Sequence, residues 1–177
     1  MIKRELYMNR IRPFIGGELI KVMTGIRRSG KSVMLELIKE ELAEAGVAPS
    51  QMISINFEDM RYSHLQTATA LHDEIIKRAE GIEGKAYLFF DEIQEVEGWE
   101  KCVNSLRVAL DCDIYITGSN AKLLSGELAT YIGGRYVEFV IYPFSFAEFL
   151  ELYHTIAPSD SIQQCFQKYL LAGGCLL

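Results

Sequence analysis

The sequence has few of the residues that build metal centres or disulfide frameworks. Its four cysteines form no C-x-x-C pair, and its three histidines are scattered along the chain. Zinc sites and redox-active dithiols need such close spacings, so the sequence argues against both. We expect four small core residues in a reduced protein: Cys102, Cys112, Cys165 and Cys175.

Long apolar runs are also missing. No stretch approaches the ~20 residues of a membrane-spanning helix. The opening "MIKRELYMNRIRPF" carries charges where a secretory leader would have its apolar segment. We therefore expect a cytoplasmic protein without a membrane partner.

The chain has no excess of positive charge. It carries 18 Lys and Arg against 24 Asp and Glu, a net charge of -6, which argues against a generally basic nucleic-acid binder. The charge is uneven, because the first 31 residues hold eight Lys and Arg and only two Glu. A basic N-terminal face suits a small anionic ligand or a local nucleic-acid contact. A basic linker over residues 1–18, standing in solvent, explains the same charges.

The sequence does have a regular alternation of apolar runs and helical patterns. Such alternation is typical of an α/β fold with a parallel sheet and helices on both faces. The expected strands are residues 19–24, 52–57, 86–90, 114–117 and 135–142. The expected helices are residues 31–46, 67–81, 99–110, 120–134, 146–154 and 161–174.

The stretch "GIRRSGKS", Gly25 to Ser32, matches G-x-x-x-x-G-K-[ST] between the first strand and the first long helix. Glycines let backbone N–H groups approach phosphate oxygens, and the helix N-terminus favours negative charge. In this motif Lys31 reaches the β- and γ-phosphates, and Ser32 offers its hydroxyl to Mg²⁺. The side chains of Arg27 and Arg28 either steer phosphate or stand in solvent. The predicted nucleotide ligands are Gly25, Arg28, Ser29, Gly30, Lys31, Ser32 and Val33.

An acidic pair follows the third strand in "YLFFDEIQ". Ligands of open parallel sheets bind at the carboxyl ends of the strands. Asp91 is therefore expected to support the Mg²⁺ that Ser32 contacts. Glu92, one residue further, can polarise a water for attack on the γ-phosphate. Acidic residues at a strand end often just meet solvent, but the phosphate loop favours the catalytic interpretation.

The fourth strand ends in "ITGSN". Ser119 or Asn120 would lie beside the acidic pair if this strand sits between the first and the third. A neutral polar group there can hold the attacking water or sense the γ-phosphate. Ser and Asn are also common helix N-caps, and both interpretations stay open.

These motifs, together with "GGRYVEFVIYPFSFAEF" and "YLLAGG", resemble the AAA-type domain of a prokaryotic ATPase family whose members carry a second, C-terminal domain. The resemblance covers nearly the whole chain and implies a P-loop NTPase three-layer sandwich with strand order 5-1-4-3-2, ATP and Mg²⁺. It implies a first sensor at Ser119 or Asn120 and a candidate arginine finger at Arg135. An ion pair or a helix-end contact would explain Arg135 equally well. The chain lacks the clear helical lid with a second sensor arginine that the wider AAA+ pattern has.

The expected organisation is a linker (1–18), a P-loop ATPase core (19–142) and the start of a helical lid or linker (143–177). The apolar ending "CLL" indicates a fragment of a longer protein, with its C-terminal domain as a partner. We expect an Mg²⁺-dependent ATP hydrolase, possible as a homo-oligomer, that couples hydrolysis to conformational change. The alternatives are a slow nucleotide-operated switch, a small-molecule P-loop kinase and, motivated by the basic N-terminus, a nucleic-acid motor.

Overall fold

The fold is built on one parallel sheet. The computed structural model describes residues 3–118, 132–156 and 160–172. The strands are β1 (Ile20–Thr24), β2 (Met52–Asn56), β3 (Ala86–Asp91), β4 (Cys112–Gly118) and β5 (Tyr136–Val140), in the order β2-β3-β4-β1-β5. Read from the other edge, this is the order 5-1-4-3-2, so that prediction and the α/β three-layer class are confirmed.

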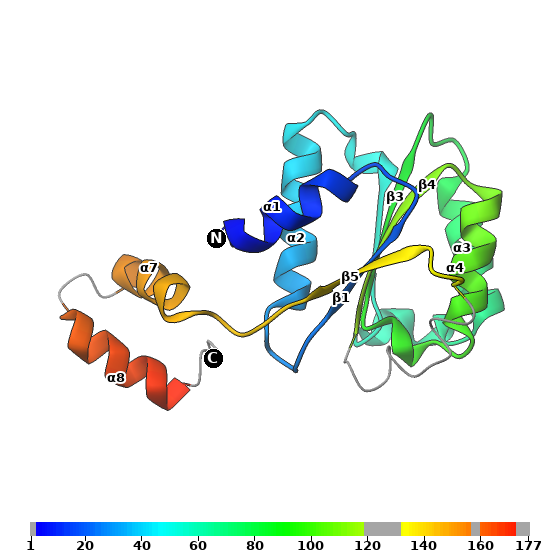
Figure 1. The fold of residues 1–177 in the computed structure, drawn as a ribbon. Coiled ribbons are helices and arrows are strands. Elements are labelled where there is room, and N and C mark those ends of the chain that lie inside the picture. Colours follow the sequence, from blue (N-terminus) through cyan, green and yellow to red (C-terminus); the bar gives the residue numbers. More distant parts are fainter. Residues whose placement is uncertain (1–2, 119–131, 157–159, 173–177) are drawn as a thin grey trace.

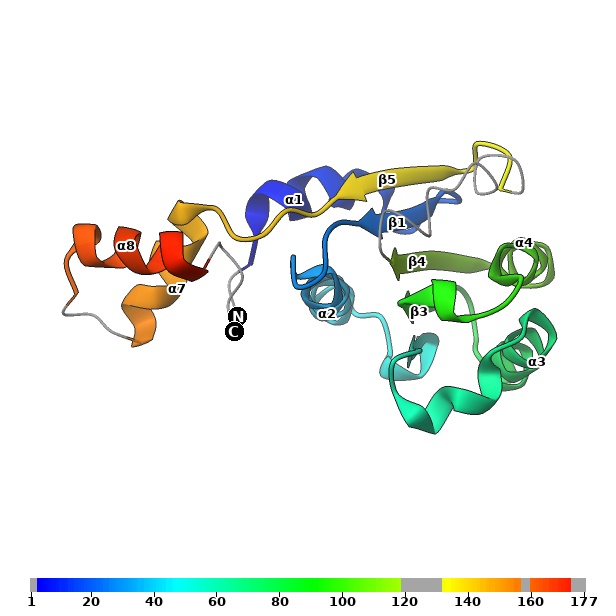
Figure 2. The ribbon, with the colours of Figure 1, turned by 90° about the horizontal axis from the view of Figure 1, so that it is seen from below.

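Helices cover both faces of this sheet. Figures 1 and 2 show α1 (Glu5–Ile11) and α2 (Lys31–Glu44) on one face, and α3 (Ala68–Ala79) and α4 (Trp99–Ala109) on the other. Two further helices follow β5, α7 (Phe146–Ile156) and α8 (Ile162–Ala172). Short 3-10 turns span Arg12–Phe14, Pro49–Gln51, Met60–Leu65 and Ile93–Glu95. None of the helices in the described ranges is long and apolar enough to cross a membrane.

Alternate residues of the central strands supply the two cores. In β3, Phe89 packs toward α1 and α2, and Phe90 packs toward α3 and α4. In β1, Met23 and Val22 divide in the same way. Neighbouring residues of a strand point to opposite faces, so a strand covered on both sides must be apolar throughout. That requirement explains why the strands were legible as continuous apolar runs.

Two of the cysteines are buried in different parts of the fold, Cys102 in the core between the sheet and α3 and α4, and Cys165 in α8. Their burial is as expected for small apolar residues. Burial raises the pKa of the Cys102 thiol to about 12. Burial, with the nearby Asp113 carboxylate, raises the pKa of Cys112 to about 11. Both thiols therefore stay protonated and unreactive at neutral pH.

The expected basic linker over residues 1–18 is wrong for its central part. Residues Glu5–Ile11 form α1, and Tyr7, Met8 and Ile11 are buried in the core on the α2 face of the sheet. These three side chains share one side of the helix, so their burial stabilises a segment too short to be stable alone. Two helical turns interspersed with charges offer too little periodicity to reveal this from sequence.

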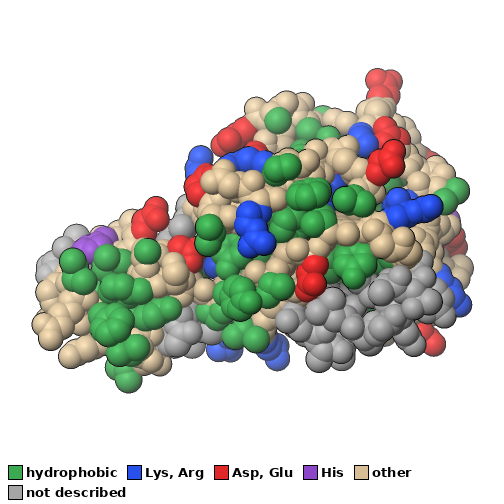
Figure 3. Space-filling model, viewed as in Figure 1, with side chains coloured by type: hydrophobic (Ala, Val, Ile, Leu, Met, Phe, Trp, Pro, Cys, Tyr) green, Lys and Arg blue, Asp and Glu red, His purple; other side chains and the backbone are tan. Residues whose placement is uncertain are grey.

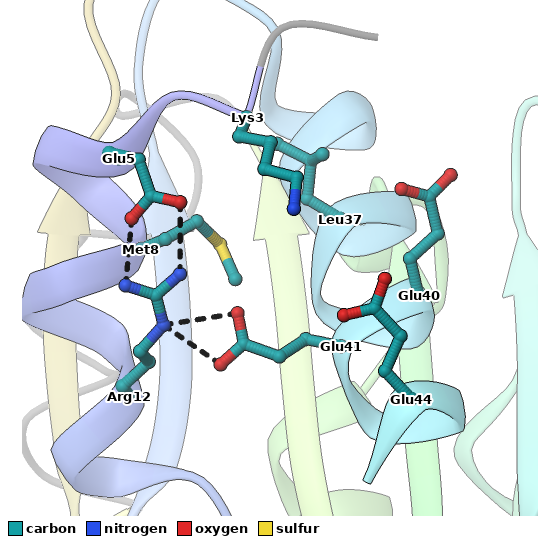
Figure 4. Close-up of a pocket in the computed structure, with 8 residues that line it drawn as sticks. All are labelled: Lys3, Glu5, Met8, Arg12, Leu37, Glu40, Glu41 and Glu44. Carbon is teal, nitrogen blue, oxygen red and sulfur yellow. Dashed lines mark hydrogen bonds and ion pairs between the residues drawn. The ribbon is translucent and has the colours of Figure 1, made fainter.

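Charged contacts also join α1 to α2. Figure 4 shows Arg12 between Glu5, 2.8 Å away, and Glu41 of α2, 2.9 Å away. The cavity beside them has a volume of about 190 Å³ and mixes both signs of charge. Its lining consists of Lys3, Glu5, Met8, Arg12, Leu37, Glu40, Glu41 and Glu44.

Helices α7 and α8 lie away from the sheet and pack on each other (Figures 1 and 2). The ring of Phe149 in α7 lies 5.4 Å from that of Tyr169 in α8. Apolar side chains gather at this end of the molecule in Figure 3, and Ile162, Phe166 and Leu170 of α8 are exposed. Helix α8 lies within the helix expected at residues 161–174, and part of its apolar surface is left exposed.

Candidate functional site

The loop between β1 and α2 has the backbone geometry that its glycines permit. Gly25 and Gly30 adopt φ values of +151° and +94°, which other residues rarely adopt. A Cβ atom on Gly25 would lie 2.2 Å from the carbonyl oxygen of Ile141, so only glycine fits there. The loop then turns directly into α2, whose first residue is Lys31.

Lys31 is buried but only loosely held. Its Nζ lies 3.4 Å from the carbonyl oxygens of Gly25 and Ile26 and 3.5 Å from Oε1 of Glu92. Only 5% of the Lys31 side chain is exposed. Three contacts of such length leave a buried cation weakly satisfied, so this ammonium group is available to an anion.

A cavity of about 470 Å³ opens beside Lys31 at the carboxyl end of the sheet. That volume falls within the range of roughly 300–1,000 Å³ typical of small-molecule sites. The N-terminus of α2 adds its positive end to the cationic side chains. The lining residues are Arg27, Arg28, Gly30, Lys31, Ser32, Val33, Glu58, Glu92 and Phe144. The structure therefore brings together six of the predicted residues: Arg28, Gly30, Lys31, Ser32, Val33 and Glu92.

Asp91 ends β3 as a buried, oriented carboxylate. Thr117 of β4 donates a hydrogen bond to Oδ1, and Asn56 of β2 donates to Oδ2 over 3.1 Å. Only 6% of the residue is exposed. Two neutral donors from the flanking strands fix the plane of the carboxylate while leaving lone pairs on each oxygen for a metal or its water ligands.

Glu92 is turned from the strand end toward the cavity. Its backbone adopts φ +56°, a left-handed conformation uncommon for a residue with a side chain. The Glu92 N–H donates to the Thr117 hydroxyl over 2.9 Å, and Gln94 donates to Oε2. Such strain is kept where surrounding contacts impose it, often at functional sites. One hydroxyl, that of Thr117, therefore positions both members of the acidic pair.

Thr117, Asn56 and Phe144 also contribute to this site, and the sequence does not mark them. Thr117 ends an apolar run that predicts only a strand, because threonine is a common strand residue. Asn56 lies opposite Asp91 in the β2–β3 register, which only the strand order reveals. Phe144 lies more than 100 positions from the loop that it faces, and nothing local marks it.

The two sensor candidates, Ser119 and Asn120, lie outside the described residues. The condition for their role is met, because β4 lies between β1 and β3 and its last residue, Gly118, pairs with Thr24. The strand end that precedes them is thus adjacent to the phosphate loop.

Arg135 is not part of this cavity. It precedes β5, and its carbonyl oxygen accepts a hydrogen bond from Ile20 N–H at the start of β1. Because the strands are parallel, that position is at the end of the sheet opposite Lys31. There Arg135 lines a separate cavity of about 290 Å³ with Asn104, Arg107, Val108, Ile132 and Gly133.

The residues present fit a polyphosphate with Mg²⁺. The Ser29 hydroxyl is buried and has no hydrogen-bond partner within the described part of the chain. Such an atom is uncommon in a folded interior and indicates a missing partner. The loosely held Lys31, the helix N-terminus and the oriented Asp91 supply cationic, N–H and carboxylate groups at the same edge of the sheet.

The chain resembles known proteins in its sequence. A family model described as AAA domain matches residues 18–150. An uncharacterised protein of Haemophilus influenzae is 44% identical over 174 residues, which are 98% of this chain and 44% of that protein. Protein MJ1544 of Methanocaldococcus jannaschii is 41% identical over 133 residues, covering 75% of this chain and 28% of that protein. The chain spans less than half the length of these relatives.

Two solved structures show the same fold at low identity. Aeropyrum pernix ORC1 in complex with DNA superposes with a TM-score of 0.62 and 16% identity, covering 88% of this chain and 49% of that chain. AMPPCP-bound DnaA from Aquifex aeolicus gives a TM-score of 0.55 and 13% identity, covering 97% of this chain and 61% of that chain. At these identities the likeness concerns the fold.

Proposed function

The chain belongs to the AAA domain family. From this premise we propose that it binds ATP with Mg²⁺ and hydrolyses the bond between the β- and γ-phosphates. The observation that carries the proposal is the placement of Lys31 and Glu92, 3.5 Å apart at the wall of the cavity beside the first turn of α2. A cation for the phosphates and a carboxylate for the attacking water thus face the same space. The AMPPCP bound to the structurally similar DnaA supports a nucleotide as the ligand.

In this proposal the phosphate loop binds the phosphates of ATP, and the acidic pair holds Mg²⁺ and activates the attacking water. Backbone N–H groups of the loop and of the first turn of α2 hold the phosphates, and Lys31 neutralises them. Bound Mg²⁺ would neutralise further phosphate charge, held by the Ser32 hydroxyl and, directly or through water, by Asp91. The remaining predicted ligands are Gly25, Arg28, Ser29, Gly30 and Val33.

Glu92 is the proposed general base. Its carboxylate can accept a proton from a water aligned with the γ-phosphate, with Ser119 or Asn120 as the sensor that holds that water. In the present state Oε1 faces Lys31 and Oε2 accepts from Gln94. A phosphate that takes over Lys31 would free Oε1 for the water, so substrate binding itself would activate the base.

The same contacts favour a slow nucleotide switch as the second candidate. While Gln94 and Lys31 both hold the Glu92 carboxylate, the base is engaged and turnover would be rare. The two candidates use the same residues and differ in rate. The acidic pair argues against a small-molecule kinase, which has a substrate hydroxyl in place of the water.

Arg135 is the proposed arginine finger of a homo-oligomer. It lies at the opposite end of the sheet from Lys31 and so cannot reach the phosphates of its own chain, but it could be offered to a neighbouring copy. Because the relatives are more than twice as long, we further propose that hydrolysis moves a C-terminal domain beyond this chain. The ORC1 structure contains DNA, but the net charge of -6 gives this chain little support as a nucleic-acid motor.

Steady-state phosphate release with ATP and Mg²⁺ tests the proposal. Wild-type protein should release phosphate, and Glu92→Gln should bind ATP with unchanged affinity but lose about 10²-fold or more in rate, because an amide does not accept the proton. Asp91→Asn should in addition weaken the Mg²⁺ dependence of ATP binding. Wild-type turnover in Glu92→Gln would assign the base to another residue.

A further inference from the structure

Arg4 is a buried cation for which the sequence predicts no role. Its side chain is fully buried, although it belongs to the segment read from sequence as a solvated basic linker. It stands at the start of α1 with φ +42°, an uncommon conformation for arginine. Burying an arginine costs free energy unless its donors are hydrogen-bonded. The three partners of Arg4 therefore show which parts of the chain it connects.

The first partner is the phosphate loop. Nη1 of Arg4 donates to the carbonyl oxygen of Ser29 over 2.8 Å. The peptide between Ser29 and Gly30 is planar and trans, so its N–H points away from its carbonyl. Fixing the Ser29 carbonyl on Arg4 therefore directs the Gly30 N–H away from Arg4. Gly30 lines the nucleotide cavity, where such an N–H would serve as a phosphate donor.

The other two partners lie at the entrance to α7. Nη2 donates to the carbonyl oxygen of Tyr142 over 2.8 Å, and Nε donates to Oε1 of Glu148 in α7 over 2.9 Å. The guanidinium also lies over two rings, 4.5 Å from the centroid of Tyr7 and 4.7 Å from that of Phe144. Phe144 also lines the nucleotide cavity, so the segment from β5 to α7 reaches the phosphate loop through Arg4 and shares the wall of the cavity with it.

We propose that Arg4 is a positioning residue that couples the conformation of the phosphate loop to the position of α7. The proposal rests on the proposed function, since ATP is the ligand that would act on the loop. Phosphates that draw the Gly30 N–H into the cavity fix the Ser29 carbonyl on Arg4, and Arg4 in turn holds the Glu148 carboxylate. By reciprocity, a change that moves α7 alters nucleotide affinity to the same extent. Arg4 thus links the phosphate loop to α7 through its hydrogen bonds.

Three variants and one control test this link. Arg4→Met removes all the donors while keeping an unbranched apolar side chain. Arg4→Lys keeps the charge, but one ammonium group cannot reproduce the guanidinium fork. Glu148→Gln breaks the charge pair without touching the cavity. Arg12→Met is the matched control, because Arg12 pairs with Glu5 and Glu41 at the surface and not with the phosphate loop.

AMPPCP titrations with Mg²⁺ should show affinity losses of about tenfold in Arg4→Met and about fivefold in Glu148→Gln, within the usual range of coupling between sites. Arg4→Lys should be intermediate and Arg12→Met close to wild type. The double variant Arg4→Met/Glu148→Gln should be no weaker than Arg4→Met alone, because both act through one link. Additive losses, or wild-type affinity in Glu148→Gln, would overturn the coupling.

Amide hydrogen exchange without nucleotide separates this proposal from the proposed function. Glu148→Gln should speed exchange in residues 26–32 relative to wild type and Arg12→Met, although Glu148 is not part of the loop. Unchanged exchange in the loop would refute the link. If wild-type protein binds no AMPPCP while the exchange effect is present, the proposed nucleotide function is wrong, but the proposed link between the loop and α7 is supported.

Discussion

The two ends of the sheet each hold a lysine close to a carboxylate, but in opposite states. At the amino end, Lys21 of β1 pairs with Asp113 of β4, and both side chains are fully buried. Asp113 also accepts from Gly16 N–H and from the Tyr115 hydroxyl, each over 2.7 Å. At the carboxyl end, Lys31 lies 3.5 Å from Glu92 beside a cavity of about 470 Å³.

The difference lies in how completely the charges are satisfied. Burial lowers the pKa of Lys21, and Asp113 opposes that shift by stabilising the ammonium form. The Lys21 ammonium donates to Asp113 and to the Gly17 carbonyl oxygen, so the charges at the amino end of the sheet are paired within the protein. Buried polar networks that are fully paired stabilise one structure. A loosely paired cation beside a cavity is instead a candidate for binding.

Arg135 offers the largest expected effect and the sharpest challenge to this division, because it lies at the amino end. As a finger for a neighbouring copy, Arg135→Ala should bind ATP normally and hydrolyse it about 10³-fold more slowly. Specific activity of wild-type protein should rise with protein concentration. Mixing Arg135→Ala with Lys31→Ala should restore some phosphate release, since each copy supplies what the other lacks.

If the mixture stays inactive and wild-type activity does not depend on concentration, Arg135 has a structural role. The amino end would then be structural throughout.

The pair of Lys21 and Asp113 should matter for stability and not for binding. Lys21→Met leaves Asp113 buried without its cation, which should lower the free energy of unfolding by about 3–5 kcal/mol. Urea denaturation measures this loss. Adding Asp113→Asn should recover part of it, because an amide oxygen still accepts from Tyr115 and Gly16. A loss below about 1 kcal/mol would place the pair among weak surface-like contacts.

The strands, the phosphate-loop motif and the acidic pair could be predicted from the sequence because each is a run of contiguous residues, whereas the strand order was predicted from the resemblance to the AAA-type family. The loop is an eight-residue motif, and apolar strands covered on both faces are legible as runs. Arg4 and Thr117 were beyond reach for a physical reason. Arg4 meets Glu148 across 144 positions of the chain, and Thr117 meets Asp91 only because β4 lies beside β3.

Thr117→Val tests how far activity at the carboxyl end of the sheet depends on the buried Thr117 hydroxyl. Valine keeps the shape of threonine but loses the hydroxyl that positions Asp91 and Glu92. ATP turnover should fall about tenfold, the order expected for a misplaced catalytic group that stays present. Thr24→Val is the control, because Thr24 is equally buried but donates to Glu138. Equal losses in both variants would show a general packing effect.

The smallest expected effect concerns Glu148 and pH. Burial raises the pKa of Glu148, but hydrogen bonds from Arg4 and Ser145 outweigh it and hold the pKa below the usual 4.5. The ionised form therefore stabilises the fold above that value, and its contribution is lost as the pH falls through the lower folded pKa. The difference in Tm between wild type and Glu148→Gln should be present at pH 7 and vanish in acid. A difference independent of pH would mean that the charge is not what stabilises α7.

The central claim is that the loosely held lysine at the carboxyl end of the sheet exists for the phosphates of ATP. Calorimetric titration of wild-type protein and Lys31→Ala with ATP and Mg²⁺, with Tm measured on the same samples, tests it most directly. The account predicts binding by wild type, no detectable binding by Lys31→Ala, and closely similar Tm values without nucleotide. Wild-type affinity in Lys31→Ala, or a collapse of its Tm like that expected for Lys21→Met, would contradict the account.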